Sequence, residues 1–182
     1  MVFKYTFGAC LFLSLLLLTV PLPWVGAAVS AAAFHEGCHL LALHLLGVRV
    51  WQLKAGGHGA SILMEPLCPW KELLAAAAGP GGSLLLSLLS RQFPRLAVCG
   101  LIQGLFNLLP VYPMDGGRIL RVVLGAFFSQ SRTDILSRWT ERITLVILLM
   151  ICLRLPRQLG IPAAGFLIFR IFYTKFPCQN GG

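Results

Sequence analysis

The stretch that decides the fold is AAAFHEGCHLLAL, residues 31–43, which places two histidines and a glutamate inside an apolar segment. On an α-helix, positions i and i+4 lie on one face, so His35 and His39 can bind one cation together. Glu36 is adjacent, where its carboxylate can act as a general base on a water molecule. Ionisable side chains at membrane depth are costly and are functional by default. The pattern H-E-x-x-H therefore predicts a metal centre, with a structural polar cluster between helices as the alternative.

The composition around this cluster is that of a membrane protein. Of the 182 residues, 57% are hydrophobic and 12% are charged, and the mean hydropathy is +0.81. A soluble domain has roughly 25% charged residues, so an ordinary soluble domain and a disordered chain are both excluded. The length fits a single membrane-embedded domain, residues 1–182, with room for about six membrane-spanning helices.

Apolar runs divide the chain into the expected helices. The runs cover residues 5–20, 24–47, 73–89, 96–109, 143–153 and 161–173. We therefore expect an all-α polytopic membrane protein with about six transmembrane helices, unless the first run is a removed signal peptide. Residues 48–64 alternate around a glycine turn and predict a short β-hairpin after the second helix. The more polar residues 117–142 are expected to form a connection.

The basic residues indicate how the chain is oriented in the membrane. The formal net charge is +9, and six crossings place 11 of the 15 Lys and Arg residues on the side of the N-terminus. The positive-inside rule then places both termini in the cytoplasm, together with the segments 48–71 and 117–142. Because the basic residues flank apolar runs, we expect contact with the lipid bilayer and none with nucleic acid.

A third metal ligand is expected because a catalytic zinc ion has three protein ligands and keeps one position for water. Asp115 is the candidate, within FNLLPVYPMDGGR at residues 106–118. Pro110 and Pro113 bar a regular helix there, and the two glycines after Asp115 allow close backbone approach. Irregular backbone at membrane depth must be buried in protein or line a wet cavity. A helix-capping ion pair between Asp115 and Arg118 is the alternative.

These two motifs together resemble the site-2 protease family of intramembrane zinc metalloproteases. The family's A-G-P element is similar to Ala78-Gly79-Pro80, and the resemblance runs from about Ser30 to Arg121. It implies a catalytic core at about residues 24–121, in the second to fourth helices. The layout looks most like the sporulation proteases that process a precursor sigma factor. The family often has asparagine shortly after A-G-P, whereas this sequence has Gly-Gly-Ser at residues 81–83.

The resemblance also implies roles for individual residues. His35, His39 and Asp115 would bind Zn²⁺, and Glu36 would activate water, which makes the protein a zinc metalloendopeptidase. Asn107, Gly79 and Pro80 would contact the substrate. That substrate is expected to be a membrane-associated protein, such as a precursor sigma factor, cut within or near the bilayer. An inhibitory membrane partner is a further expectation, whereas a PDZ domain and a nucleotide-sensing domain are not expected.

Two other functions compete with proteolysis. A non-catalytic membrane scaffold could keep a structural zinc site, but a scaffold needs no general base such as Glu36. A zinc transporter would require acidic residues in several membrane segments, and five of the six apolar runs contain none. For a protease, the expected hairpin offers an edge strand that could hold an unwound substrate through backbone hydrogen bonds.

Overall fold

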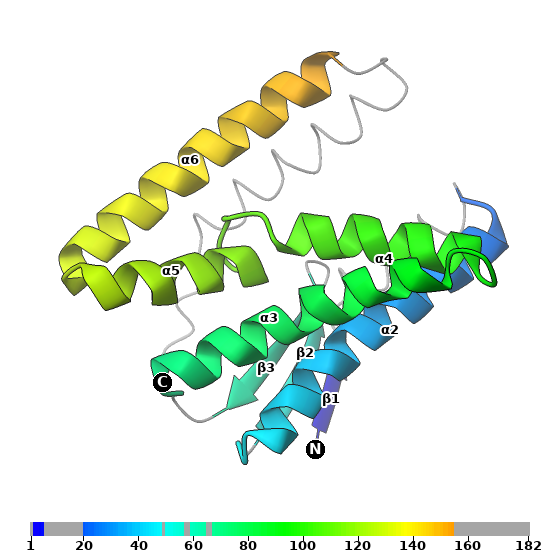
Figure 1. Cartoon of the computed structure of the whole chain (residues 1–182), viewed down its shortest axis with the longest axis horizontal. Helices are drawn as coiled ribbons and strands as arrows, with labels where there is room; N and C mark the ends of the chain where they lie inside the picture. The colour runs from blue at the N-terminus through cyan, green and yellow to red at the C-terminus, as the bar shows by residue number, and fades with distance from the viewer. Residues whose placement is uncertain (1, 6–19, 49, 57–58, 65–66, 155–182) are drawn as a thin grey trace.

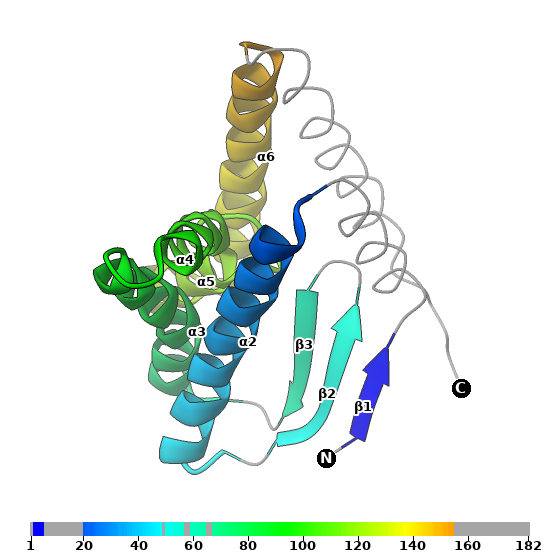
Figure 2. The same cartoon turned by 90° about the vertical axis from the view of Figure 1, so that its right-hand side faces the viewer.

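The computed structural model describes residues 2–5, 20–48, 50–56, 59–64 and 67–154 (Figure 1). Its elements, in chain order, are β1 (Val2–Tyr5), α2 (Leu22–Leu45), β2 (Val50–Gly56), β3 (Gly59–Met64), α3 (Pro69–Leu85), the 3₁₀ turn η1 (Leu86–Leu89), α4 (Pro94–Asn107), α5 (Asp115–Phe127) and α6 (Gln130–Arg154). The described chain is thus mostly helical, with one small sheet beside α2 (Figure 2).

Three strands form the sheet, in the order β1-β2-β3. β2 and β3 are antiparallel, with Gly56 opposite Gly59 at the turn end. β1 joins β2 in parallel, so the sheet is larger than the hairpin expected over residues 48–64. Tyr5, where the first apolar run was expected to begin, ends β1, and residues 6–19 of that run lie outside the described residues. β3 is the edge strand that lies next to α2 (Figure 2).

Prolines mark the starts of the first three described helices. Pro23, Pro69 and Pro94 occupy the first or second helical position of α2, α3 and α4. Proline is favoured there because its missing N–H would lack an intrahelical partner in any case. At its other end, α2 stops before Gly47, whose φ of 69° lies in the left-handed region.

The centre of the bundle is α3, which packs against α2, α4 and α5. Its buried positions are mostly small: Ala75, Ala76, Gly79, Pro80, Gly82 and Ser83. Small residues let helix backbones approach closely, as at membrane helix interfaces. On α4, a Cβ added at Gly104 would lie 3.1 Å from the Cβ of Ser83, so this close approach depends on glycine.

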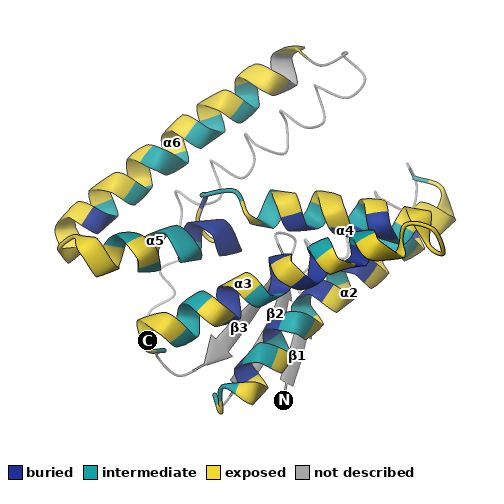
Figure 3. Ribbon diagram, viewed as in Figure 1, coloured by how far each residue is buried: buried dark blue, intermediate teal, exposed yellow. Residues whose placement is uncertain are grey.

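The segment 117–142, which was expected to connect two membrane segments, is mostly helical. Most of this segment belongs to α5 and to the first half of α6, and the chain breaks only near Phe128, where the backbone is extended. No proline occurs between Pro113 and Pro156, so nothing prevents helix formation. The polar residues of this segment lie on helices, and much of α6 is exposed in the structure (Figure 3).

One helical segment within the described residues, Pro69–Leu89, is long and apolar enough to cross a membrane by length and composition. α2 has sufficient length, but two histidines and a glutamate near its centre lower its mean hydropathy. The run at 161–173 lies outside the described residues, so six crossings stay a prediction. Large apolar side chains are exposed on every described helix, as expected for surfaces that face lipid (Figure 3).

Candidate metal centre

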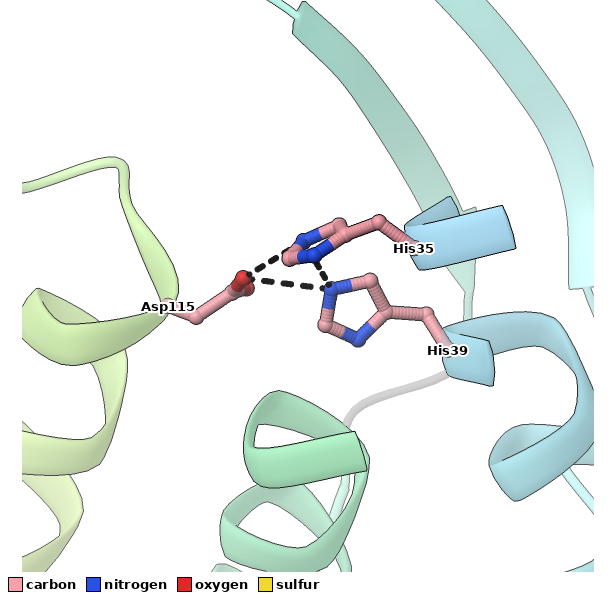
Figure 4. A group of neighbouring side chains, drawn as sticks. All are labelled: His35, His39 and Asp115. Atoms are coloured by element: carbon pink, nitrogen blue, oxygen red, sulfur yellow. Dashed lines mark hydrogen bonds and ion pairs between the residues drawn. The ribbon is translucent and has the colours of Figure 1, made fainter. Parts of the chain in front are cut away.

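The structure brings the three predicted ligands together although they come from distant parts of the chain. His35 and His39 project from α2 toward Asp115, the first residue of α5 (Figure 4). Their side chains are buried, with residue exposures of 2%, 6% and 8% respectively. Asp115 Oδ2 lies 3.1 Å from His35 Nε2 and 3.2 Å from His39 Nε2, and the two Nε2 atoms are 3.2 Å apart.

This triangle of atoms has the size of a metal coordination face. A tetrahedral zinc ion with bonds of about 2.0–2.1 Å holds its ligand atoms roughly 3.3 Å apart. The observed separations of 3.1–3.2 Å come close to that value. Two imidazole nitrogens and one carboxylate oxygen, with a fourth position left for water, are a donor set typical of catalytic zinc.

The hydrogen bond on the far side of His39 supports the same conclusion. Its Nδ1 lies 2.7 Å from the carbonyl oxygen of Ala75, which can only accept, so Nδ1 carries the proton. In the neutral ring, Nε2 then has a lone pair directed at Asp115. Lone pairs on Nε2 and on a carboxylate oxygen repel one another unless a cation or a proton lies between them. A metal ion would resolve this arrangement.

Gly79 leaves the space that the His39 ring occupies. A Cβ added at Gly79 would lie 2.2 Å from His39 Nε2 and 2.5 Å from Cε1, much closer than any real contact. Its neighbour Pro80 is almost completely buried. The A-G-P element therefore lies directly behind the ligands, and its glycine is required by the ring that packs on it.

Two further glycines position Asp115. A Cβ added at Gly116 would lie 2.0 Å from the carbonyl oxygen of Leu108, and one at Gly117 would lie 2.7 Å from the carbonyl carbon of Val111. The start of α5 thus rests directly on the backbone that follows α4. This is the close approach that the sequence suggested, and it directs Asp115 toward α2.

The alternative pairing of Asp115 with Arg118 is not what the structure shows. Asp115 contacts the two histidines, whereas Arg118 Nε lies 3.6 Å from Glu72 Oε1 at the start of α3. Glu36 is partly buried and lies close enough to both histidines and Asp115 to interact with them electrostatically. Its neighbours are thus the three predicted ligands.

Asn107 is the last residue of α4 and is partly buried. Its Nδ2 donates to the carbonyl oxygen of Gln103 at 3.1 Å, so the amide is held within its own helix. The structure thus places Asn107 shortly before the irregular segment that leads to Asp115.

Two residues that contact the predicted ligands were not predicted from the sequence. Ala75 accepts the hydrogen bond from His39, and Ser83 Oγ lies 2.8 Å from His35 Nδ1. With Gly79 they form the series 75, 79, 83 on α3, so all three lie on the face that meets α2. The spacing of four between small residues in an apolar run was the available signal. The sequence did not say which helix that face would meet.

Comparisons with known proteins agree with this geometry. The family model described as peptidase family M50 matches residues 89–151. A Synechocystis protein provisionally named a zinc metalloprotease is 30% identical over 124 residues, covering 56% of this chain and 33% of the relative. A zinc metalloprotease of Methanocaldococcus jannaschii is 28% identical over 134 residues, covering 65% of this chain and 40% of the relative.

A solved structure has the same fold. The site-2 protease from Methanocaldococcus jannaschii superposes with a TM-score of 0.71 at 21% identity, over 99% of this chain and 93% of that one. By contrast, the chain spans only about a third and two-fifths of the length of the two curated relatives. The chain is thus similar to peptidase family M50 over residues 89–151 and to two zinc metalloproteases over part of their length, and it shares the fold of a solved site-2 protease.

Proposed function

We propose that this chain is an intramembrane zinc metalloprotease of the site-2 type. The observation that carries the proposal is the convergence of His35, His39 and Asp115 on one buried point, with Glu36 beside two of them. The names of both curated relatives support zinc and proteolysis. A scaffold or a transporter would not need Glu36 at this position.

The chain's own residues can perform the reaction as follows. His35, His39 and Asp115 would hold Zn²⁺, which supplies Lewis acidity and lowers the pKa of a water molecule to about 7. Glu36 accepts the proton of the attacking water and delivers it to the leaving amine as the peptide bond breaks. Their burial keeps bulk solvent away and strengthens each of these electrostatic interactions.

The proposed substrate is a membrane-associated protein, and a precursor sigma factor is the specific candidate. A helical substrate hides its peptide bonds, so it must unwind before cleavage. The edge strand β3 lies beside α2 and could hold an extended segment through backbone hydrogen bonds (Figure 2). Asn107 is proposed to contact the substrate. Gly79 and Pro80 are also proposed to contact the substrate. Their burial supports a second role, which is to pack behind the ligands.

The proposed setting is the cell membrane, with several crossings and both termini in the cytoplasm. The exposed apolar side chains of the helices support the membrane setting, and the bias of basic residues supports the orientation. Labelling of a cysteine introduced at Arg132 tests it, because this exposed residue of α6 should react only from the cytoplasmic side. Labelling only from the outside would show that the chain has the opposite orientation.

The decisive experiment separates the base from the ligands. Glu36→Gln should keep one zinc ion per chain but abolish shortening of a co-expressed precursor sigma factor, since losing a general base typically costs about 10²–10⁴ in rate. Asp115→Asn should lose both zinc and cleavage, because an amide is a poorer ligand. Asp134→Asn, on exposed α6, is the matched control and should lose neither. Cleavage by Glu36→Gln at the wild-type rate would refute the mechanism and favour a structural zinc site.

A further inference from the structure

We propose that Ser83 is a positioning residue that holds His35 in the one tautomer able to bind the metal. This inference rests on the proposed zinc site and concerns the side of His35 that faces away from the metal. Ser83 Oγ lies 2.8 Å from His35 Nδ1. The side chain of Ser83 is completely buried, and His35 is 2% exposed, so bulk water does not compete for this hydrogen bond.

The argument depends on where the imidazole proton lies. A neutral imidazole has one N–H, and a metal-binding Nε2 must offer its lone pair, so Nδ1 has to carry the proton. A buried N–H without an acceptor costs about 1–3 kcal/mol in general. Ser83 Oγ lies where it can accept this proton from His35 Nδ1, and in the proposed role it does so. Without it, the tautomer with Nε2–H directed at Asp115 becomes the favoured one, and that tautomer cannot bind a cation.

The two histidines are supported in different ways. His39 donates to the carbonyl oxygen of Ala75, which belongs to the backbone and is present whatever residue occupies position 75. His35 depends on a side-chain hydroxyl, which a substitution can remove. The structure therefore gives one ligand a fixed support and the other a replaceable one. A single substitution at position 83 should affect only the His35 half of the site.

Neighbouring glycines keep Ser83 in place. A Cβ at Gly100 would lie 3.0 Å from the carbonyl oxygen of Ser83, and one at Gly104 would lie 3.1 Å from its Cβ. α4 thus packs directly on the α3 backbone at this point and holds the hydroxyl between α2 and α4. The packing leaves little room for a larger side chain at position 83. A larger side chain that keeps the hydroxyl therefore tests the hydrogen bond separately from the packing.

The test measures zinc affinity of the full chain in detergent by chelator competition, and the absorption spectrum of bound Co²⁺. Ser83→Ala should weaken zinc binding about 10- to 100-fold, the usual effect of removing the partner of a metal-bound histidine. It should also shift the Co²⁺ spectrum. Ser87→Ala is the matched control, because Ser87 lies one turn after Ser83 and its Oγ donates to the Leu84 carbonyl oxygen at 2.6 Å. It should change affinity less than twofold.

Ser83→Thr separates the hydrogen bond from packing. Threonine keeps the hydroxyl but adds a methyl group to a fully buried position, so it disturbs packing more than alanine does. If the hydroxyl positions His35, zinc affinity falls in the order wild type, Ser83→Thr, Ser83→Ala, even where threonine lowers the thermal unfolding midpoint. If Ser83 only fills space, threonine is the worse substitution, and the proposal is overturned.

His35→Ala distinguishes failure of this inference from failure of the proposed function. Full zinc occupancy in His35→Ala would show that the metal centre itself is wrongly assigned. Loss of zinc in His35→Ala, together with wild-type affinity and Co²⁺ spectrum in Ser83→Ala, would reject the positioning role alone. Should threonine prevent folding, Ser83→Ala and Ser87→Ala still decide the question, because alanine removes atoms and adds none.

Discussion

The metal centre and helix α6 both bury polar groups, but only in the metal centre do these groups lie within hydrogen-bond distance of other described residues. His35, His39 and Asp115 each have partners at 2.7–3.2 Å. On α6, Thr133 Oγ1 and Ser137 Oγ are buried and have no hydrogen-bond partner among those residues. The buried polar atoms of the metal centre are thus placed next to one another, whereas the two buried hydroxyls of α6 are not.

Glycines differ between the two regions in the same way. At the metal centre, Gly79 and Gly116 are required because a ring or a carbonyl group occupies the space of their missing side chains. On α5, Gly125 has nothing within 4 Å of an added Cβ. The positions of the ligands are therefore set by close backbone contacts, whereas α6 packs mainly against α5 and tolerates more change.

The largest effect is expected for Gly79→Ala, which tests whether close packing holds the ligands. The new Cβ would overlap the His39 ring, so the ring must move and zinc affinity should fall by at least about 10²-fold. Gly81→Ala, on the same helix with nothing within 4 Å, should leave affinity unchanged. Equilibrium zinc titration of both variants is the measurement, and equal affinities would contradict the role of Gly79.

A smaller effect is expected for Gly116→Ala, which tests the backbone contact that positions Asp115. Its Cβ would meet the carbonyl oxygen of Leu108, and relieving that clash should destabilise the fold by about 1–3 kcal/mol and weaken zinc binding. Gly125→Ala faces open space and should stabilise α5 by up to about 1 kcal/mol through helix propensity. Thermal unfolding compares the two, and destabilisation by both would remove the distinction between the regions.

The smallest effect is expected for Thr133→Val, which tests a buried hydroxyl of α6. Thr133 is 2% exposed, and its hydroxyl oxygen has no partner among the described residues. Valine has nearly the same shape and no polar oxygen to bury, so unfolding stability should stay equal or rise by about 1 kcal/mol. Destabilisation by more than that would show that the hydroxyl has a partner, such as an ordered water, and that this polar group is also satisfied.

Much of the metal centre could be predicted because its main signal is local. The pairing of His35 with His39 follows from the helical repeat alone, and the placement of Glu36 follows from adjacency. Asp115 could be proposed because the prolines before it bar a regular helix and the two glycines after it allow close backbone approach.

The sequence was less informative about segments whose structure depends on what they contact. Residues 117–142 were expected to be a connection from their polarity, and that signal did not indicate that most of them are helical. The pairing of β1 with β2 joins residues about fifty positions apart, and no local pattern specifies such a contact. Both differences arise because a single sequence carries no direct information about partners in space.

The sequence by itself determined that two histidines share a helix face with a glutamate between them, because backbone geometry fixes that spacing in any fold. Only the tertiary structure decided that α3 meets this face with Ala75, Gly79 and Ser83. It also decided that Asp115 completes the triangle across 80 positions of sequence. The physical reason is that the residue type alone decides whether a side chain can bind a metal. The position of that side chain depends on how closely α2, α3 and α5 pack.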